Sequence, residues 1–349
     1  MSSGASPSAS HPHASLDILL LGGSGLISGA AAATFLAAGH RVTVLSRGQR
    51  PLPVGVEALT ADRSDRAALA GALQGRRFDF TADFLAFDAP DVEMLFHEPY
   101  ASLGRYVMIS TGQVYLVTDR ATPPWREADA DRPVMPEPET GTRAHHNWVY
   151  GTGKRRAEAT LRALRRSHGV RGVALRLPVV QGEADTTRRL WAYLERMLDG
   201  GPVLLPDGGQ HPVRFVYVGD VAAALLAIAQ GAPADAPEYN LAQPDEPMLR
   251  AFLERVAALA GVEPRFVDVS SEQLEAAGIP LTFSPFSGPW CSRPDPSRAA
   301  MEWGFHAKRS EEYLPSVVRA HLEAPRGTSH PGYEHRALEL ELASRLAGA

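Results

Sequence analysis

A short stretch near the start of the chain limits the fold more than any other feature. Residues 16–21 are almost entirely apolar, and the glycine-rich segment Gly22 to Gly25 follows them directly. The alanine-rich residues 28–38 then predict a helix, and residues 41–45 predict a second short strand. A strand, a tight turn, a helix and a strand over roughly thirty residues fit a βαβ unit, whose two strands are parallel. An apolar first strand is typical of a parallel sheet covered on both faces.

The same alternation continues along the first half of the chain. Further strands are predicted at residues 55–60, 78–87, 104–110 and 173–177, and helices at residues 64–74, 90–103 and 150–167. This pattern predicts an α/β fold: a Rossmann-type doubly wound parallel sheet with a smaller C-terminal α/β substrate domain.

The expected domain boundaries follow changes in this pattern. Beyond Pro178 the strict alternation ends, and helices are expected at residues 187–199, 221–230 and 335–347. We therefore divide the chain into a disordered tail (1–15), a dinucleotide-binding domain (16–177, with 213–232 returning to it), a substrate-binding domain (178–212 and 233–325) and a C-terminal tail with a helix (326–349).

Composition excludes several classes of function. Thirty-five basic and 40 acidic side chains give a net charge of −5, which argues against a nucleic-acid partner. Cys291 is the only cysteine, so the chain forms no internal disulfide, and no metal site is expected. The first fifteen residues lack a secretory signal, and His11 and His13 are interpreted as part of a polar tail. Glycines interrupt the uncharged stretch 18–39, so no membrane span is expected and the predicted location is cytoplasmic.

The glycine-rich turn predicts a site for a dinucleotide. It ends the first strand and opens the first helix, where backbone amides and the helix dipole can hold a pyrophosphate. We predict cofactor contacts there from the turn and the helix start, at Gly22, Gly25, Leu26 and Ile27. The alternative is a tight connection that binds nothing.

The end of the second strand indicates which cofactor binds. No acidic residue stands where a ribose 2′-hydroxyl would be bound, while Arg47 and Arg50 can pair with a 2′-phosphate. NADP is therefore favoured, and NAD stays open. The alternative is a pair of solvated surface arginines. Asp62 ends the third strand and is predicted to accept from the adenine amino group, with Arg63 beside it in the same site.

The strongest chemical signal is Tyr150 and Lys154, which lie four residues apart at the predicted start of a helix and hence on one face. The chain has only one other lysine, Lys308, and otherwise uses arginine. A compact ammonium can bind ribose hydroxyls while its field lowers the phenol pKa from about 10 toward neutrality, so that tyrosine acts as acid or base. The alternative is a tyrosine and a lysine stacked on the surface.

Hydroxyl groups stand at the end of another predicted strand. Ser110 and Thr111 follow residues 106–109, so they lie at the carboxyl edge of the sheet, where open α/β folds bind ligands. We predict Thr111 as the donor to a substrate oxygen and a capping role for Ser110.

Other candidates have two interpretations each. The aromatic residues of segment 280–296 suit either a pocket lining or a packed loop: Phe283, Phe286 and Trp290. His145 and His146 are interpreted as a solvated loop pair. Three arginines suit either a substrate phosphate or carboxylate or an ordinary surface role: Arg188, Arg189 and Arg214.

Together these motifs resemble the extended, or atypical, short-chain dehydrogenase/reductase family, which includes nucleotide-sugar epimerases, dehydratases and reductases. The resemblance covers about residues 16–320 and rests on the following set: the glycine-rich turn, Asp62, Ser110 to Tyr115, Tyr150 with Lys154, Arg176-Leu177-Pro178 and Tyr217 to Val221. It implies that Thr111 binds the substrate oxygen, Tyr150 moves the proton and Lys154 holds the nicotinamide ribose. It also implies a homodimer as one expected assembly.

The sequence departs from the family pattern at three places. Ser28 replaces the third glycine of the turn, which places the first helix slightly farther from the sheet without preventing cofactor binding. Gly112 and Gln113 stand where dehydratases carry an Asp-Glu pair, so a sugar 4,6-dehydratase is not expected. Val179 stands where epimerases commonly carry a diphosphate-binding asparagine, which weakens the nucleotide-sugar interpretation.

Two classes of function follow. The first is an NAD(P)-dependent oxidoreductase acting on a secondary alcohol or ketone of a small-molecule substrate, as a reductase or as an epimerase on a sugar-like or natural-product substrate. The alternative is a non-catalytic cofactor- or RNA-binding protein on the same fold, against which the complete Thr-Tyr-Lys set argues.

Overall fold

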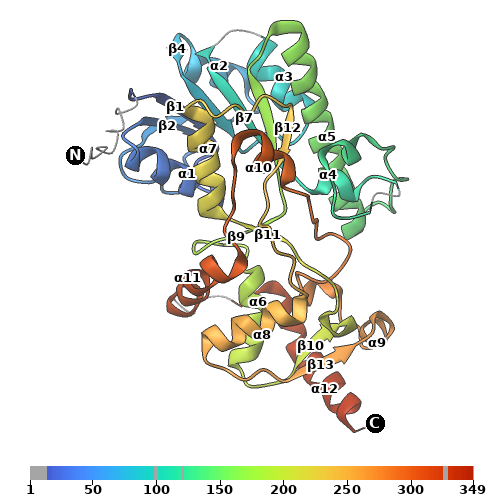
Figure 1. The fold of residues 1–349 in the computed structure, drawn as a ribbon. Coiled ribbons are helices and arrows are strands. Elements are labelled where there is room, and N and C mark those ends of the chain that lie inside the picture. The colour runs from blue at the N-terminus through green and yellow to red at the C-terminus, as the bar shows by residue number, and fades with distance from the viewer. Residues whose placement is uncertain (1–13, 98–100, 120–121, 325–328, 349) are drawn as a thin grey trace, which may run out of the picture.

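A seven-stranded parallel sheet forms the centre of the larger part of the molecule (Figure 1). The structure is a computed structural model that describes residues 14–97, 101–119, 122–324 and 329–348. Its strand order is β12-β8-β7-β5-β1-β2-β3, and every neighbouring pair in it is parallel. The chain runs outward from β1 to β3 and then returns to β5 on the other side, so the topological switch point lies between β1 and β5. The predicted doubly wound sheet is confirmed.

The strands of the sheet are short, as the sequence predicts. They are β1 (Asp17–Leu21), β2 (Arg41–Ser46), β3 (Glu57–Thr60), β5 (Phe80–Asp83), β7 (Arg105–Thr111), β8 (Gly172–Leu177) and β12 (Glu238–Asn240). A minor pair, β4 (Arg76–Arg77) and β6 (Ala101–Ser102), lies beside them. The central strands are buried over nearly their whole length because helices cover both faces.

The two faces of the sheet are covered by different helices. α1 (Leu26–Ala37) and α7 (Val218–Ala229) pack on one face around Phe35 and Leu225. The other face carries α2 (Arg66–Leu73), α3 (Ala89–His97) and α5 (Arg143–His168), with Leu69, Leu95 and Leu161 in the core beneath them.

The smaller part of the molecule lies beyond the carboxyl edge of the sheet (Figure 1). It contains the parallel pair β10 (Val203–Pro206) and β13 (Phe266–Val269) and the helices α6 (Arg189–Leu198), α8 (Leu249–Ala260), α9 (Ser271–Ala276), α11 (Ser310–Glu323) and α12 (Arg336–Ala347). A second parallel pair, β9 (Val179–Gln181) and β11 (Phe215–Tyr217), lies where the chain passes between the two parts.

The C-terminal helix is fixed by a buried ion pair. Arg196 of α6 donates to the Glu339 carboxylate of α12 over 2.7 Å, and both side chains are buried. Helix α12 therefore packs on the smaller part, and the helix predicted at 335–347 is confirmed.

Of the tail expected at the start of the chain, residues 1–13 lie outside the described residues.

Two elements differ from the sequence predictions. α5 begins at Arg143 instead of residue 150, because the Thr142 hydroxyl caps it by accepting from the His145 amide over 3.1 Å. His145 and His146 therefore lie in a helix and not in a loop. Residues 238–240, expected in the substrate-binding domain, form the edge strand β12 of the large sheet, and α10 (Ser297–Trp303) packs beside them.

None of the helices in the described part of the chain combines the length and the apolar composition that a bilayer crossing needs.

A buried carboxylate joins α5 to two strands. Glu158 of α5 accepts from the Ser110 hydroxyl of β7 over 2.6 Å and from the Arg176 guanidinium of β8 over 2.7 and 3.0 Å. Arg176 also donates to the Tyr115 hydroxyl, which in turn donates to Asn240 of β12 over 2.6 Å. Ser110 thus bonds to a helix instead of capping its own strand.

Replacing Glu158 by alanine is expected to destabilise the fold strongly. The Glu158→Ala variant leaves the Arg176 charge buried without its partner, which costs about 3–5 kcal/mol. Urea unfolding measures the loss. A matched control is Glu341→Ala in α12, where the pair with Arg345 is exposed and is worth about 0.5 kcal/mol or less. Equal losses in both variants would contradict this role of the buried pair.

Candidate active site

The glycine-rich turn follows β1 and lies between β2 and the segment after β5, with no space for a side chain at Gly22 or Gly23. Gly22 has φ +91°, and a Cβ on it would lie 2.7 Å from Leu85 Cγ. A Cβ on Gly23 would lie 1.9 Å from Val44 Cγ1 of β2. Gly25 then forms the N-cap of α1. The turn therefore brings backbone and a helix N-terminus to the switch point of the sheet, where α/β folds bind nucleotides.

Ser28 completes this turn. Its hydroxyl accepts from the Gly25 amide over 3.0 Å and donates to the Gly25 carbonyl over 3.3 Å, and the side chain is buried. The serine that replaces the family's third glycine therefore folds back onto the turn instead of filling the cavity.

Two hollows meet at this turn, and Gly25, Ser28, Phe84 and Phe87 line both. The first, which we name the tyrosine pocket, has a volume of about 620 Å³ and contains Thr111, Tyr150 and Lys154 in its wall. The second, named the arginine pocket, has about 590 Å³ and contains Arg47 and Arg50. A two-part hollow astride a glycine-rich turn has the form that a dinucleotide requires.

The predicted cofactor residues divide between the two pockets. Leu26 and Ile27 line the tyrosine pocket, while Gly22, Asp62 and Arg63 line the arginine pocket with the two arginines.

Asp62 and Arg63 already have partners within the protein. The Ser64 hydroxyl and amide donate to the Asp62 carboxylate over 2.7 and 2.9 Å and lower its pKa, and Arg47 lowers it further. Arg63 donates to the Asp83 carboxylate and to the Asp91 carbonyl, each over 2.7 Å. The guanidinium of Arg63 therefore stabilises the wall of the arginine pocket.

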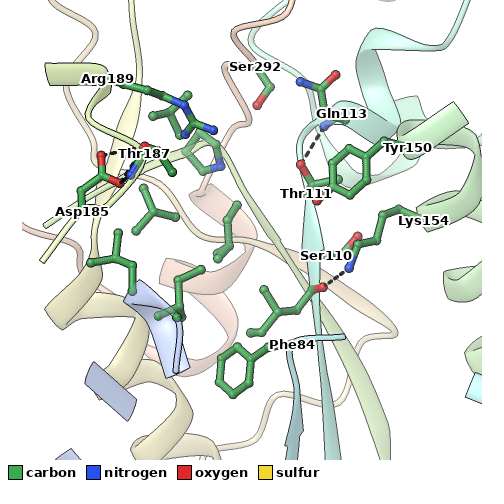
Figure 2. Close-up of a pocket in the computed structure, with 18 of the residues that line it drawn as sticks. Phe84, Ser110, Thr111, Gln113, Tyr150, Lys154, Asp185, Thr187, Arg189 and Ser292 are labelled. Carbon is green, nitrogen blue, oxygen red and sulfur yellow. Dashed lines mark hydrogen bonds between the residues drawn. The ribbon is translucent and has the colours of Figure 1, made fainter. Parts of the chain in front are cut away.

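The three predicted catalytic residues meet in the tyrosine pocket (Figure 2). Thr111 ends β7, and Tyr150 and Lys154 point toward it from α5. Lys154 is 2% exposed, and its ammonium donates to the Ile109 carbonyl over 2.8 Å. It also lies 4.9 Å from the centroid of the Phe87 ring.

Two glycines in α5 allow this close approach. A Cβ on Gly151 would lie 2.8 Å from the Gln113 carbonyl, and one on Gly153 would lie 2.7 Å from the Phe87 carbonyl. Sequence reasoning missed their role, although glycines on either side of Thr152 in a helix are a visible signal, because glycine weakens a helix unless packing requires it.

Burial shifts both titrating groups. It lowers the pKa of Lys154 to about 8, against the opposing effect of Asp83 and Glu158. It raises the pKa of Tyr150, against the opposing effect of the Thr111 hydroxyl and of Arg189. The predicted lowering of the Tyr150 pKa by Lys154 is wrong for this structure, because the ammonium is held at the Ile109 carbonyl, 6.0 Å from the phenol ring centroid.

The opposite wall of the tyrosine pocket comes from segments distant in sequence. Figure 2 shows Asp185, Thr187 and Arg189 across the pocket from Tyr150. Trp290 and Ser292 add to the lining. Asp185, Thr187, Ser292 and Asn147 carry no local motif. Sequence reasoning named Arg189 and Trp290 as candidates and Gln113 as part of the Ser110 to Tyr115 segment.

The remaining candidates lie elsewhere. Phe283 and Phe286 are buried in the core. Arg214 donates to the Pro294 carbonyl over 2.7 Å and pairs with Glu246, and His145 lies 2.9 Å from Glu137. Arg188 forms the N-cap of α6. The described residues contain no group of three or more His, Cys, Asp or Glu side chains that could hold a metal ion.

Comparison with known proteins agrees with this geometry. Residues 92–242 match the model of the NAD dependent epimerase/dehydratase family. This match supports the family resemblance predicted from the sequence. It covers the strand end with Thr111 and the helix that carries Tyr150 and Lys154.

Three proteins are similar to this chain in sequence or in fold. A 2′-dehydrokanamycin reductase of Streptomyces kanamyceticus is 28% identical over 272 residues, which are 75% of this chain and 73% of the reductase. A chloroplast stem-loop binding protein of 41 kDa from Arabidopsis thaliana is 24% identical over 239 residues, 64% of this chain and 58% of that protein. The fold is shared with a dTDP-glucose 4,6-dehydratase from Streptomyces venezuelae, solved with NAD, at TM-score 0.67 and 19% identity, covering 90% of this chain and 99% of that one.

The buried lysine predicts a pH dependence of stability. An unfolded lysine titrates near 10.5, while Lys154 in the folded protein titrates near 8, so between these values the unfolded chain binds more protons. Stability therefore rises with pH through this window. From pH 7.5 to 9.5 the free energy of unfolding is expected to rise by about 2 kcal/mol more in the wild type than in Lys154→Met.

Urea unfolding at a series of pH values measures this difference. The Lys308→Met variant, which removes the only other lysine, is the control and is expected to keep the wild-type rise. Parallel pH profiles for the wild type and Lys154→Met would contradict the assignment.

Proposed function

We propose that this protein is an NADP-dependent reductase that converts a ketone of a small sugar-like or natural-product substrate to a secondary alcohol. The observation that carries the proposal is the meeting of Thr111, Tyr150 and Lys154 in a pocket continuous with the glycine-rich turn. The 28% identity to a 2′-dehydrokanamycin reductase supports this direction of reaction. An epimerase, which retains its cofactor and shows no net turnover, is the closest alternative.

A nicotinamide cofactor fits the two pockets. Gly25 at the start of α1 leaves the helix N-terminus open to a pyrophosphate, and Arg47 and Arg50 stand where a 2′-phosphate would lie. The dehydratase that shares this fold was solved with NAD. When bound, the cofactor supplies the hydride, and Lys154 with Tyr150 would hold its ribose.

The protein's own residues handle the proton. Because burial raises the Tyr150 pKa, its phenol is protonated at neutral pH and can donate to a developing alkoxide. The Thr111 hydroxyl beside it would donate a hydrogen bond to the same substrate oxygen. The buried ammonium of Lys154, held at the Ile109 carbonyl, adds a positive charge to the same pocket.

The wall of the tyrosine pocket favours a compact substrate over a nucleotide sugar. Among the described residues that line it, Lys154 and Arg189 are the only cations, and Arg214 is committed to Glu246 and Pro294. Val179 is apolar where a diphosphate-binding asparagine would stand. The neutral Gly112 and Gln113 offer no acid for elimination, which argues against dehydratase activity.

Removing the phenol hydroxyl is expected to stop the reaction without preventing cofactor binding. The Tyr150→Phe variant should lower kcat by about 10²–10⁴, the range that general acid catalysis contributes, with a small change in the KM for NADPH. The test is NADPH oxidation with ketone substrates, with alcohol measured alongside. The control is Tyr333→Phe, which removes a hydroxyl that donates to Asp199 at the C-terminal end of α6. This variant should retain the wild-type kcat. A product formed without net NADPH consumption would identify an epimerase instead.

The two arginines of the arginine pocket are expected to select NADPH. Each charge-assisted hydrogen bond to a 2′-phosphate is worth at least about 1.5 kcal/mol, so the double variant Arg47→Ala/Arg50→Ala should raise the KM for NADPH by about 100-fold or more and leave that for NADH nearly unchanged. Steady-state kinetics with both cofactors measures the ratio. Arg66→Ala, an exposed arginine on α2, is the control. A wild-type preference for NADH would contradict the choice of NADP.

RNA binding is the second candidate, because one relative is a chloroplast stem-loop binding protein. A specific feature favours it: Arg105, Arg165, Arg166 and Arg171 line a hollow of about 340 Å³ where β7 begins, far from the tyrosine pocket. RNA binding through these side chains would weaken steeply with salt. Retention of a stem-loop RNA that falls with salt, in protein that binds no nicotinamide cofactor, would replace the reductase proposal.

A further inference from the structure

Two side-chain amides line the tyrosine pocket, those of Gln113 and Asn147. Gln113 is the first residue of α4 (Gln113–Leu116), and Asn147 lies three residues before Tyr150 in α5. Figure 2 shows Gln113 on the side of Thr111 opposite Lys154. In the proposed reaction Lys154 lies on the cofactor side of the reacting atoms, so the amides are on the substrate side.

The orientation of the Gln113 amide is fixed by its neighbours. Its Nε2 donates to the Trp290 carbonyl over 2.9 Å, and a carbonyl only accepts, so the nitrogen faces Trp290 and Oε1 is the other atom. The Gln113 backbone amide also donates to Thr111 Oγ1 over 3.2 Å. These two bonds hold Gln113 beside the residue that binds the reacting oxygen.

Each amide has one buried atom with no hydrogen-bond partner among the described residues. They are Gln113 Oε1, an acceptor, and Asn147 Nδ2, a donor. A buried polar atom left without a partner costs about 1–3 kcal/mol, so such atoms in a pocket wall mark a place where a ligand group binds. Here the two atoms are of complementary kinds.

We propose that Gln113 and Asn147 determine substrate specificity by binding a hydroxyl group on the carbon next to the one that is reduced. A hydroxyl donates one hydrogen bond and accepts others, so a single hydroxyl can donate to Gln113 Oε1 and accept from Asn147 Nδ2. An ammonium group cannot accept a hydrogen bond, and a second carbonyl group cannot donate one. The substrate class is therefore the α-hydroxy ketones, as in an oxidised sugar ring; this inference rests on the proposed reductase function.

The neutral amide also suits binding rather than proton removal. A carboxylate at position 113 could take a proton from the substrate, whereas Gln113 is neutral and stays a hydrogen-bonding group. Ser292 packs against the neighbouring Gly112, where a Cβ would lie 2.0 Å from Ser292 Oγ. The segment from Trp290 to Ser292 thus supports this end of the pocket.

The experiment compares α-hydroxy ketones with partners that lack only the hydroxyl. The probes are 2-hydroxycyclohexanone against cyclohexanone and 3-hydroxybutanone against butanone, with NADPH as the reductant and the full chain as the enzyme. The wild type is expected to prefer the hydroxy ketone by about 10–100-fold in kcat/KM, the value of two buried hydrogen bonds. Gln113→Met and Asn147→Leu should each reduce this ratio at least about fivefold, with both kcat/KM values measured in the same variant.

The ratio of kcat/KM for the hydroxy ketone to that for the deoxy ketone separates a loss of hydroxyl binding from a loss of stability. A destabilised variant loses activity on both ketones alike, so its ratio does not change. Gln74→Met, at the exposed end of α2, is the control and should keep the wild-type ratio. Equal kcat/KM for hydroxy and deoxy ketones, or an unchanged ratio in both pocket variants, would overturn the inference and leave the reductase function standing. Failure to reduce all four ketones, together with no binding of NADPH, would overturn the proposed function and the inference with it.

Discussion

The buried carboxylate of Glu158 is the contact on which the geometry of the site depends. Tyr150, Lys154 and Glu158 lie four residues apart along α5 and therefore share one face of the helix. Glu158 is bonded to Ser110, the residue immediately before Thr111, and to Arg176 on the next strand. The register between α5 and β7 thus sets how Thr111 faces Tyr150. An ion pair isolated from water suits this purpose, because the cost of breaking it disfavours alternative registers.

Small residues then determine how closely the helix approaches. Gly151 lies against the backbone carbonyl of Gln113 in α4, and Gly153 lies against that of Phe87 in the loop after β5, so any larger residue would displace α5 from the sheet edge. The close contact excludes water from around Lys154, which lowers the pKa of its ammonium. Tyr150 keeps 37% of its surface exposed, and the partial desolvation of its phenol raises the pKa of that group. The proton chemistry of the site follows from packing as much as from the choice of the tyrosine and the lysine.

The fold and half of the site could be predicted from the sequence because their signals are local. The βαβ unit is contained in consecutive residues, and the Tyr-Lys spacing needs only one helix. The start of α5 was placed too late because its cap, Thr142, lies at the end of a proline-rich stretch. The edge strand β12 has only three residues and includes Glu238 and Asn240, whose burial depends on partners such as Tyr115 and Glu127 far along the chain. Asp185, Asn147 and Ser292 meet only after folding, so no local pattern could group them.

The bond between the Trp290 carbonyl and Gln113 joins positions 177 residues apart. In the proposed reductase, the residues that would hold the cofactor and donate the proton precede residue 155, whereas a late segment of the chain completes the end of the pocket that would contact the rest of the substrate. In such an enzyme, changes in the segment from Trp290 to Ser292 would alter which ketone is accepted while the residues that would move the proton stay as they are. A chain organised in this way can acquire a new substrate by exchanging one loop, without having to rebuild its chemistry.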